Sequence, residues 1–300
     1  MVGECMVEFT CEKGRRVEGF GGDTLNAALY LARLLKGREV TVSYATRLGD
    51  DAPSHAMLRA WRQEGIDCAL VEQVPGCSLG CYWINVDARG ERVFTYDRAG
   101  APAREMFSGD ASALVAKLRR HDALYVSGIT LAILRPVGRD RLLHLMKAMK
   151  DAGKAVIYDT NHRPALWDKA EGALAANRAA LNAATLALPS REDLAGLFGL
   201  ESARDCLALL TGLAIPEIVL KQGGDPVHLV YEGRHKIVAL EPVGTPVDTT
   251  AAGDSFNAGY IAGRLAGESP PRATDRAIRL SRLVIGHRGA LVPRQAMTAL

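Results

Sequence analysis

Short apolar segments alternate with amphipathic segments along most of the chain. Each of five apolar segments precedes a stretch with the 3.6-residue period of a helix: residues 40–45, 123–128, 155–160, 185–189 and 217–223. Strands that are apolar throughout and stand between helices are typical of a parallel sheet covered on both faces. The pattern therefore predicts an α/β fold, with a doubly wound, mostly parallel sheet flanked by helices. No obvious linker interrupts it, so we expect residues 1–300 to form a single domain.

One insertion departs from this alternation. Residues 79–87 and 91–98 show the period-2 pattern of half-exposed strands, and a short glycine-containing turn separates them. We expect a β-hairpin within residues 79–98 that acts as a small lid. Its side chains Tyr82, Tyr96 and Arg98 could close on a ligand, although a dimer contact is at least as common a use of exposed aromatic groups. A strand-like pattern is already under way at residue 2, so whether the N-terminus is complete stays open.

Composition narrows the range of partners. The chain has 37 basic and 34 acidic residues, a net charge of +3, and no block of either sign, so we expect neither nucleic acid nor a membrane surface as partner. No apolar run approaches the roughly 20 residues that span a bilayer, and we expect no secretory leader, because no basic-then-apolar segment precedes a small-residue cleavage site. The six cysteines contain no CxxC pair, which favours free thiols in a reducing compartment. We therefore expect a cytoplasmic protein with a small-molecule partner.

Candidate chemistry concentrates in the stretch DTTAAGDSFNAGY, residues 248–260. Asp248 and Asp254 are separated only by threonine, alanine and glycine, as expected where a ligand must approach the backbone closely. A glycine-containing turn that leads into a helix offers free N–H groups and the positive end of the helix dipole to a phosphate. A carboxylate belongs there only if it accepts a proton or positions the attacking group. The stretch predicts a phosphoryl-transfer site; a plain helix start, capped by Asp254 or Ser255, is the alternative.

Several motifs together carry a resemblance to a known family. With GGDTLN at residues 21–26, the lid and DTTAAGD at residues 248–254, the chain resembles the ribokinase-type (pfkB-type) carbohydrate kinases over nearly its full length. Within that family it is similar to the sugar-acid kinases, through GECMVEF (3–9), YDR (96–98), LYVSGITLAIL (124–134), DTNHRPALW (159–167) and RGALVPR (288–294).

The resemblance implies an activity and its alternatives. The expected reaction is ATP-dependent phosphorylation of 2-keto-3-deoxygluconate at its terminal hydroxyl, with Mg²⁺ or a similar divalent cation. The alternatives are another acceptor, such as fructose, ribose or a different sugar acid, and a sugar-binding regulator that has lost catalysis. Relatives often pair through the lid, so the resemblance also implies a homo-oligomer.

The resemblance also assigns roles to individual residues. It implies that Asp254 is the catalytic base and that the N–H groups of Ala251, Ala252 and Gly253 form the anion hole. The residues that match the family's sugar-binding positions are Gly22, Asn26, Tyr82, Tyr96, Arg98 and Arg163. The nucleotide would lie along Ser190, Lys221, Gly223 and Gly224, beside Ala251 and Gly253. Arg98 and Arg163 are the two cations that we expect to hold the carboxylate of a sugar acid.

Some of these assignments have simpler explanations or stay open. Without the motif, Arg163 would be a solvated loop residue and Lys221 an ordinary strand residue. His162 has no second ligand at metal spacing, so a hydrogen-bonding role is favoured. Many family members have an Asn-x-x-Glu segment that organises metal-bound water, and here Ser190 and Asp193 occupy its ends, which leaves the part of Asp193 at the metal open. A monovalent-cation site around Asp248 and Thr250 also stays open.

Overall fold

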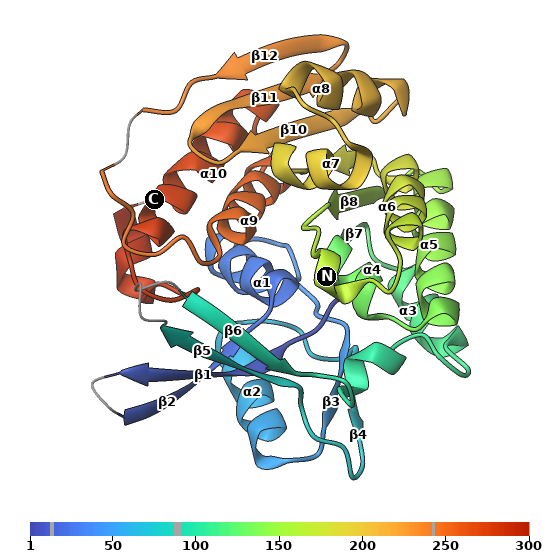
Figure 1. The fold of residues 1–300 in the computed structure, drawn as a ribbon, viewed down its shortest axis with the longest axis vertical. Helices are drawn as coiled ribbons and strands as arrows, with labels where there is room; N and C mark the ends of the chain where they lie inside the picture. Colours follow the sequence, from blue (N-terminus) through green and yellow to red (C-terminus); the bar gives the residue numbers. More distant parts are fainter. Residues whose placement is uncertain (13–14, 87–91, 242–243, 300) are drawn as a thin grey trace.

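The larger of the main sheets has six strands. The computed structural model describes residues 1–12, 15–86, 92–241 and 244–299, and Figure 1 shows how its elements are arranged. The sheet order is β12-β11-β10-β9-β8-β7. Strands β7 to β10 are parallel, whereas β11 and β12 extend the sheet in antiparallel pairs. The strands are β7 (Ala123–Ser127), β8 (Ala155–Asp159), β9 (Leu186–Ala187), β10 (Glu217–Gln222), β11 (Asp225–Tyr231) and β12 (Arg234–Val238). The predicted α/β fold with a mostly parallel sheet is confirmed.

Helices cover both faces of this sheet (Figure 1). One core cluster joins Tyr125, Ile157 and Val219 of the strands to α1 (Asp23–Leu34), α2 (Ala52–Gln63), α9 (Ala252–Leu265) and α10 (Pro270–Ile285). The other joins the neighbouring strand residues Leu124, Val156 and Ile218 to α3 (Ser112–Leu118), α4 (Gly128–Ile133), α5 (Pro136–Asp151), α6 (Ala170–Ala183), α7 (Arg191–Phe198) and α8 (Ala203–Gly212). Successive strand side chains point to opposite faces, which is why the strands are apolar throughout. In the part of the chain described, no helix is both long and apolar enough to cross a membrane.

The lid is a second sheet of four strands in the order β2-β1-β5-β6. The predicted hairpin is present as β5 (Cys81–Val86) and β6 (Arg92–Asp97), an antiparallel pair in which Tyr82 lies opposite Tyr96. Its turn, at residues 87–91, lies outside the described residues. The lid also contains a second hairpin that the sequence pattern did not predict, β1 (Met6–Glu12) and β2 (Arg15–Gly21), and β1 pairs in parallel with β5.

The N-terminal residues connect the lid to the larger sheet. The N–H of Val2 donates to Tyr125 O (3.1 Å) in β7, and the N–H of Gly3 donates to Ala45 O (3.2 Å). The predicted strand at residues 40–45 is wrong in its extent. Only Ser43 and Ala45 form bridges there, and the strand β3 (Thr46–Gly49) begins after them and pairs with β4 (Val71–Val74). Three short 3₁₀ helices complete the described chain: η1 (Pro102–Glu105), η2 (Pro164–Leu166) and η3 (Arg294–Ala299).

Candidate active site

The turn before α9 is held by Asp248 and by an unusual backbone conformation. Asp248 Oδ1 accepts the N–H (3.0 Å) and the hydroxyl (2.7 Å) of Thr250, and Oδ2 accepts the N–H of Gly289 (2.7 Å). Ala251 then takes the left-handed conformation (φ 60°), which a non-glycine residue adopts rarely. Helix α9 starts at Ala252, with Ala251 as its N-cap and no side-chain cap. The simpler interpretation of Asp254 or Ser255 as a helix cap is therefore wrong, because both lie inside the first turn.

The first turn of α9 presents free backbone donors. The N–H of Ala252 donates to Thr249 O (3.2 Å), so one of the three predicted anion-hole donors has a partner inside the turn. Among the described residues, no hydrogen-bond acceptor is found for the N–H groups of Gly253 and Asp254. Gly253 is exposed, and a Cβ on it would contact only Lys221 Nζ, at 3.8 Å. An anion can therefore approach the helix N-terminus with the Lys221 ammonium beside it.

Asp254 points from this turn toward the first turn of α1. The side-chain amide of Asn26 donates to Asp254 Oδ2 (2.9 Å). Burial raises the pKa of Asp254 to about 8, with the nearby carboxylate of Asp23 acting in the same direction, while the Asn26 hydrogen bond opposes both. A general base works best when its pKa lies near the working pH. The pKa of Asp254 is thus raised into the range in which a general base works at neutral pH.

A buried polar network holds Lys221 next to the free donors. Lys221 Nζ donates to Asn257 Oδ1 (2.9 Å) and to Asp159 Oδ1 (3.2 Å). Asn257 Nδ2 donates to Asp159 Oδ2 (2.8 Å) and to the hydroxyl oxygen of Tyr125 (3.0 Å). Burial raises the pKa of Asp159, and the ammonium of Lys221 opposes this shift. Asp159 and Asn257 were not among the predicted site residues. The position of Asn257, one helical turn after Asp254 and so on the same face of α9, is a sequence signal that could have indicated it.

The loop after β8 connects two predicted segments. Asp193 accepts the hydroxyl of Thr160 at Oδ2 (2.8 Å) and the N–H of His162 at Oδ1 (3.0 Å), and its own N–H donates to Ser190 Oγ (3.0 Å). Both carboxylate oxygens of Asp193 are therefore engaged by the protein. No group of three or more potential metal ligands occurs among the side chains that the structure describes. Ser190, the N-cap of α7, also lies beside Lys221 through a backbone bridge.

The lid and α1 meet at two glycines. A Cβ on Gly22 would lie 2.3 Å from the carbonyl oxygen of Glu4, and a Cβ on Gly21 would lie 2.0 Å from Tyr82 Oη, so neither position has room for a side chain. Tyr82 donates its hydroxyl proton to Glu8, and its ring lies 5.7 Å from the Tyr96 ring, centroid to centroid. Burial raises the pKa of Tyr82.

The two predicted carboxylate-binding arginines are in different environments. Arg98 forms an ion pair with Glu4, and its guanidinium carbon lies 5.7 Å from the centroid of the half-exposed Tyr96 ring. Arg163 is exposed and donates to its neighbour, His162 O (2.9 Å). The structure therefore brings Arg98 to the lid base and leaves Arg163 at the surface of the loop after β8.

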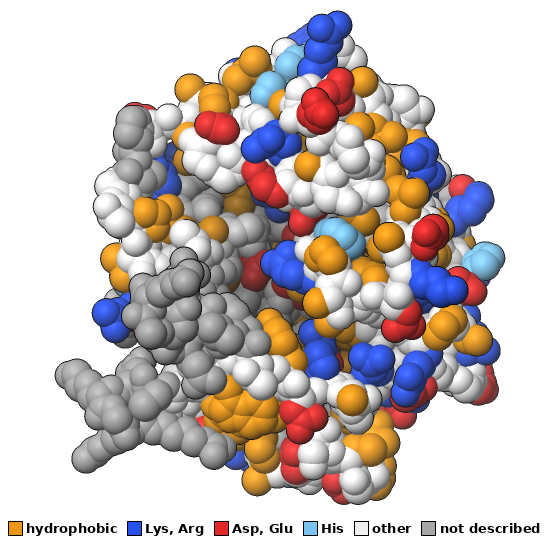
Figure 2. All heavy atoms as spheres, viewed as in Figure 1, with side chains coloured by type: hydrophobic (Ala, Val, Ile, Leu, Met, Phe, Trp, Pro, Cys, Tyr) orange, Lys and Arg blue, Asp and Glu red, His pale blue; other side chains and the backbone are white. Residues whose placement is uncertain are grey.

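The predicted nucleotide-binding glycines lie in an open turn. Gly223 (φ 59°) and Gly224 connect β10 to β11, and a Cβ on either would meet no atom within 4 Å. Figure 2 shows that this face of the molecule is hollowed near its middle, with acidic and basic side chains gathered around the hollow. A ligand larger than a phosphate can therefore extend from the helix N-terminus across the surface.

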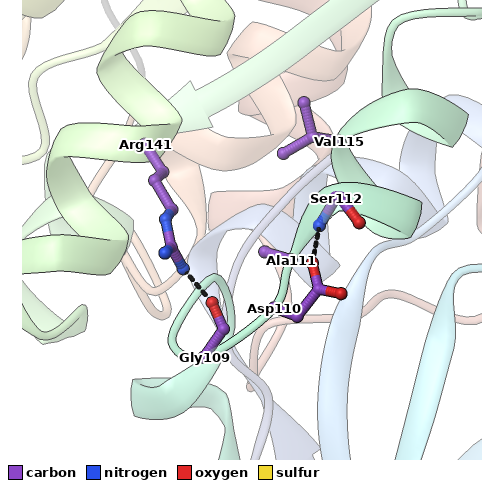
Figure 3. A pocket seen from close by; sticks show the side chains of 6 residues that line it. All are labelled: Gly109, Asp110, Ala111, Ser112, Val115 and Arg141. Atoms are coloured by element: carbon purple, nitrogen blue, oxygen red, sulfur yellow. Dashed lines mark hydrogen bonds between the residues drawn. The ribbon is translucent and has the colours of Figure 1, made fainter.

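Two further cavities lie elsewhere and contain none of the predicted site residues. The first, of about 470 Å³, is lined by Gly109, Asp110, Ala111, Ser112, Val115 and Arg141 (Figure 3). Arg141 donates to Gly109 O, and the N–H of Ser112 donates to Asp110 Oδ1 (3.0 Å). The second, of about 320 Å³, shares Asp110 and Ala111 with the first. The predicted site is thus formed by the helix start, the strand ends and the lid, and not by these cavities.

The fold and this site together define a class of enzyme. Residues 1–297 match the pfkB family carbohydrate kinases, and the chain belongs to this family. It is 40% identical to the 2-dehydro-3-deoxygluconokinase of Escherichia coli K12 over 304 residues, which is 100% of this chain and 98% of that protein. The PfkB protein of Polaromonas sp. JS666 has a similar structure (TM-score 0.85, 26% identity, covering 100% of this chain and 98% of that one). The structure of a ribokinase II of E. coli in complex with ATP and Mg²⁺ is also similar (TM-score 0.83, 20% identity, covering 96% of this chain and 92% of that one).

Proposed function

We propose that the protein transfers the γ-phosphoryl group of ATP to the terminal hydroxyl of 2-keto-3-deoxygluconate, also named 2-dehydro-3-deoxygluconate, and forms the 6-phosphate. The observation that carries phosphoryl transfer is the placement of Asp254 beside the free N–H groups of α9 and the ammonium of Lys221. The acceptor follows from the full-length similarity to the E. coli kinase of that name.

Asp254 is the residue that handles the proton. Asn26 occupies Oδ2, so Oδ1 is the oxygen that accepts the proton of the acceptor hydroxyl. The hydroxyl oxygen forms its new bond to the γ-phosphorus as the bond to the β-phosphate oxygen breaks, and ADP leaves with that electron pair. Because burial and Asp23 keep the pKa of Asp254 high, its carboxylate is a stronger base than an exposed aspartate.

The donors around Gly253 stabilise the transferring group. The N–H groups of Gly253 and Asp254 and the ammonium of Lys221 face the position where charge builds up on the phosphoryl oxygens. Asp159 and Asn257 hold that ammonium in place. Mg²⁺ usually binds phosphates, water and one or two carboxylates, and it would neutralise charge on the phosphates of ATP here. ATP binding along Ser190, Lys221, Gly223 and Gly224 is part of this proposal, and Asp193 is its candidate for an indirect metal contact.

The acceptor is proposed to lie between α1 and the lid. Gly22 leaves room for it, Asn26 and Asp254 bind the reacting end, and Tyr82, Tyr96 and Arg98 cover it from the lid. Arg98, and Arg163 from the loop after β8, bind its carboxylate at the opposite end. Arginine suits this role because its planar fork can hold a carboxylate through two parallel hydrogen bonds.

A coupled assay of ADP release against a panel of acceptors tests this function. The panel is 2-keto-3-deoxygluconate, fructose, ribose and gluconate, each with saturating MgATP. We expect turnover with the keto-deoxy acid at a kcat/KM that exceeds the values for the neutral sugars by about 100-fold or more. If kcat/KM is higher for fructose or ribose than for the keto-deoxy acid, the protein is a kinase of that neutral sugar instead. Binding of sugars with no ADP release from any of them would indicate a regulator.

The assembly, cation and compartment are also proposals. We propose a homo-oligomer that forms through the lid, supported by Tyr96 and Val17, which are 51% and 39% exposed there. A monomeric mass in mass photometry would contradict it. Cytoplasmic location is supported by the free thiols of Cys5, Cys68, Cys77 and Cys206, and cell fractionation tests it. Asp248 already accepts three hydrogen bonds from the protein, so we leave a monovalent cation out of the proposed mechanism; activity that depends on K⁺ would reverse this.

A further inference from the structure

Three charged side chains form a cluster at the base of the lid. Glu4 is 3% exposed, and Arg98 keeps 10% of its side chain exposed while it pairs with Glu4. Arg104, in η1, is half-buried and follows Arg98 by two successive backbone turns: the N–H of Ala101 donates to Arg98 O (3.1 Å), and the N–H of Arg104 donates to Ala101 O (3.1 Å). Burial raises the pKa of the Glu4 carboxyl group, and Arg98 and Arg104 both oppose this shift. Within these three side chains, two guanidinium groups share the one carboxylate of Glu4 in a place with little access to water. The carboxylate of Asp23 is also near enough to raise the pKa of Glu4.

The hydrogen bonds of this cluster are incomplete. Within the described chain, three fully buried polar atoms of the cluster have no hydrogen-bond partner: Glu4 Oε1, Arg98 Nε and Arg104 Nε. Arg104 also forms no salt bridge with any described residue. A buried donor without an acceptor is costly and rare in native proteins. Two unpaired guanidinium donors at one place indicate a site that an anion completes.

The cluster adjoins the proposed acceptor site. The backbone carbonyl of Glu4 lies 2.3 Å from the position of a Cβ on Gly22, so Glu4 and the start of α1 are in direct contact. Arg98 follows the last residue of β6, whose Tyr96 covers the acceptor in our proposal. The segment with Arg104 is fixed independently, because Arg47 donates to Glu105 O (2.8 Å) and the N–H of Arg135 donates to Arg104 O (3.1 Å).

We propose that Arg104 joins Arg98 in binding the carboxylate of the acceptor, and that Glu4 is the internal counter-ion of both guanidinium groups. This inference rests on the proposed function, and it adds a specificity-determining residue and a positioning residue to it. Glu4 engages the NH2 group of Arg98 and leaves Nε–H free. The carboxylate of the sugar acid accepts hydrogen bonds from Nε–H of Arg98 and Nε–H of Arg104, which have no partner in the described part of the protein. A neutral sugar has no carboxylate and leaves both N–H groups unpaired.

The first experiment removes one positive charge. Arg104→Gln is compared with Arg135→Gln, a control on the neighbouring segment whose arginine is half exposed and pairs with Glu105 (2.7 Å). Because a charge-assisted hydrogen bond is lost, we expect Arg104→Gln to raise KM for 2-keto-3-deoxygluconate by about 10- to 100-fold. KM for ATP should stay within about twofold of wild type, as it should in the control. An unchanged KM for the acid in Arg104→Gln would overturn the role of Arg104.

The second experiment removes the negative charge of Glu4. Here we expect bound acid to stabilise the variant more than it stabilises wild type. In Glu4→Gln the two arginines lose their internal counter-ion, so the variant should unfold at a lower temperature than wild type. The acid then supplies the missing charge. We expect its binding to raise the Tm of Glu4→Gln by more than it raises the Tm of wild type, since tighter binding to the native state stabilises it more. An equal increase in both proteins would contradict the counter-ion role.

The outcomes separate this inference from the proposed function. If wild type does not phosphorylate the acid, the proposed function fails whatever the variants do. If wild type phosphorylates the acid, and Arg104→Gln binds it as tightly as the Arg135→Gln control, only the inference fails. Arg104→Lys keeps the charge and loses the planar fork, so its KM should lie between those of wild type and Arg104→Gln.

Discussion

The side-chain amide of Asn26 donates to Asp254 Oδ2 over 2.9 Å and joins two helix starts that are 228 residues apart in the sequence. Asn26 lies in the first turn of α1, and Asp254 lies in the first turn of α9. The hydrogen bond occupies one carboxylate oxygen and leaves the other for a proton. The two helices therefore orient the base before any substrate binds.

Asp254→Asn should remove the proton acceptor without changing the shape of the site. A positioned general base contributes about 10²- to 10⁴-fold in rate, so kcat should fall by that range while ATP binding changes little. Stopped-flow or steady-state kinetics, with ATP affinity from calorimetry, measure both quantities. A kcat close to the wild-type value would mean that another group accepts the proton.

The pH dependence of kcat/KM should report the ionisation of Asp254. Only the ionised carboxylate accepts a proton, so kcat/KM should fall as the pH drops through the raised pKa, about 8 in the free protein. Asp23→Asn should move this limb to lower pH, because it removes a negative charge that disfavours ionisation. Asn26→Ala should move it to higher pH, because the lost hydrogen bond favoured the ionised form. Profiles that coincide in all three proteins would rule out Asp254 as the titrating group.

Bulk at Gly253 should reduce activity far more than stability. A side chain there contacts only Lys221 Nζ at 3.8 Å in the free protein, but it occupies the path of the phosphate to the backbone N–H groups. Gly259→Val, on the same helix, is the matched control. Its Cβ would lie 2.8 Å from Ala277 Cα, so it should mainly lower the Tm. Calorimetry and kinetics on both variants separate these effects, and equal losses of Tm and activity in Gly253→Val would contradict the anion site.

Lys221→Met should weaken both the binding and the transfer of the phosphoryl group. Loss of one charge-assisted contact corresponds to about 10- to 100-fold in kcat/KM for ATP. Lys147→Met is a suitable control, because Lys147 forms an exposed pair with Asp151 on α5. We expect the control to keep wild-type kinetics. Kinetics of Lys221→Met that match the control would place the phosphate elsewhere.

Arg163→Ala tests the substrate preference. Wild type should prefer the keto-deoxy acid to fructose and ribose by about 100-fold or more in kcat/KM, and Arg163→Ala should lose most of this preference through KM. Tyr96→Phe should have a smaller effect, because it removes one neutral hydrogen bond. A preference that survives Arg163→Ala would leave the carboxylate to Arg98 and Arg104.

Much of the fold could be predicted because its cause is local. The strands β7, β8 and β10 are apolar throughout because both faces of the sheet are covered, and this shows directly in the sequence. The second lid hairpin was missed because the strand-like pattern that starts near residue 2 does not show that a second strand, β2, pairs with it before Gly22. The strand predicted at residues 40–45 was placed too early in the chain, since β3 begins at Thr46. An apolar segment does not show at which residue it begins to pair with a neighbouring strand.

By itself, the sequence determined the α/β class, the glycine-containing turn that leads into α9 and the motifs of the pfkB family, since each depends on residues close together in the chain. Only the tertiary structure decided which distant groups meet. The Lys221 ammonium has Asp159 and Asn257 as partners, 62 and 36 residues away, and Arg98 is paired with Glu4, 94 residues away. These contacts follow from how the strand ends, helix starts and lid pack together. Packing, and not any local pattern, therefore sets the charge balance around these groups and the pKa of Asp254.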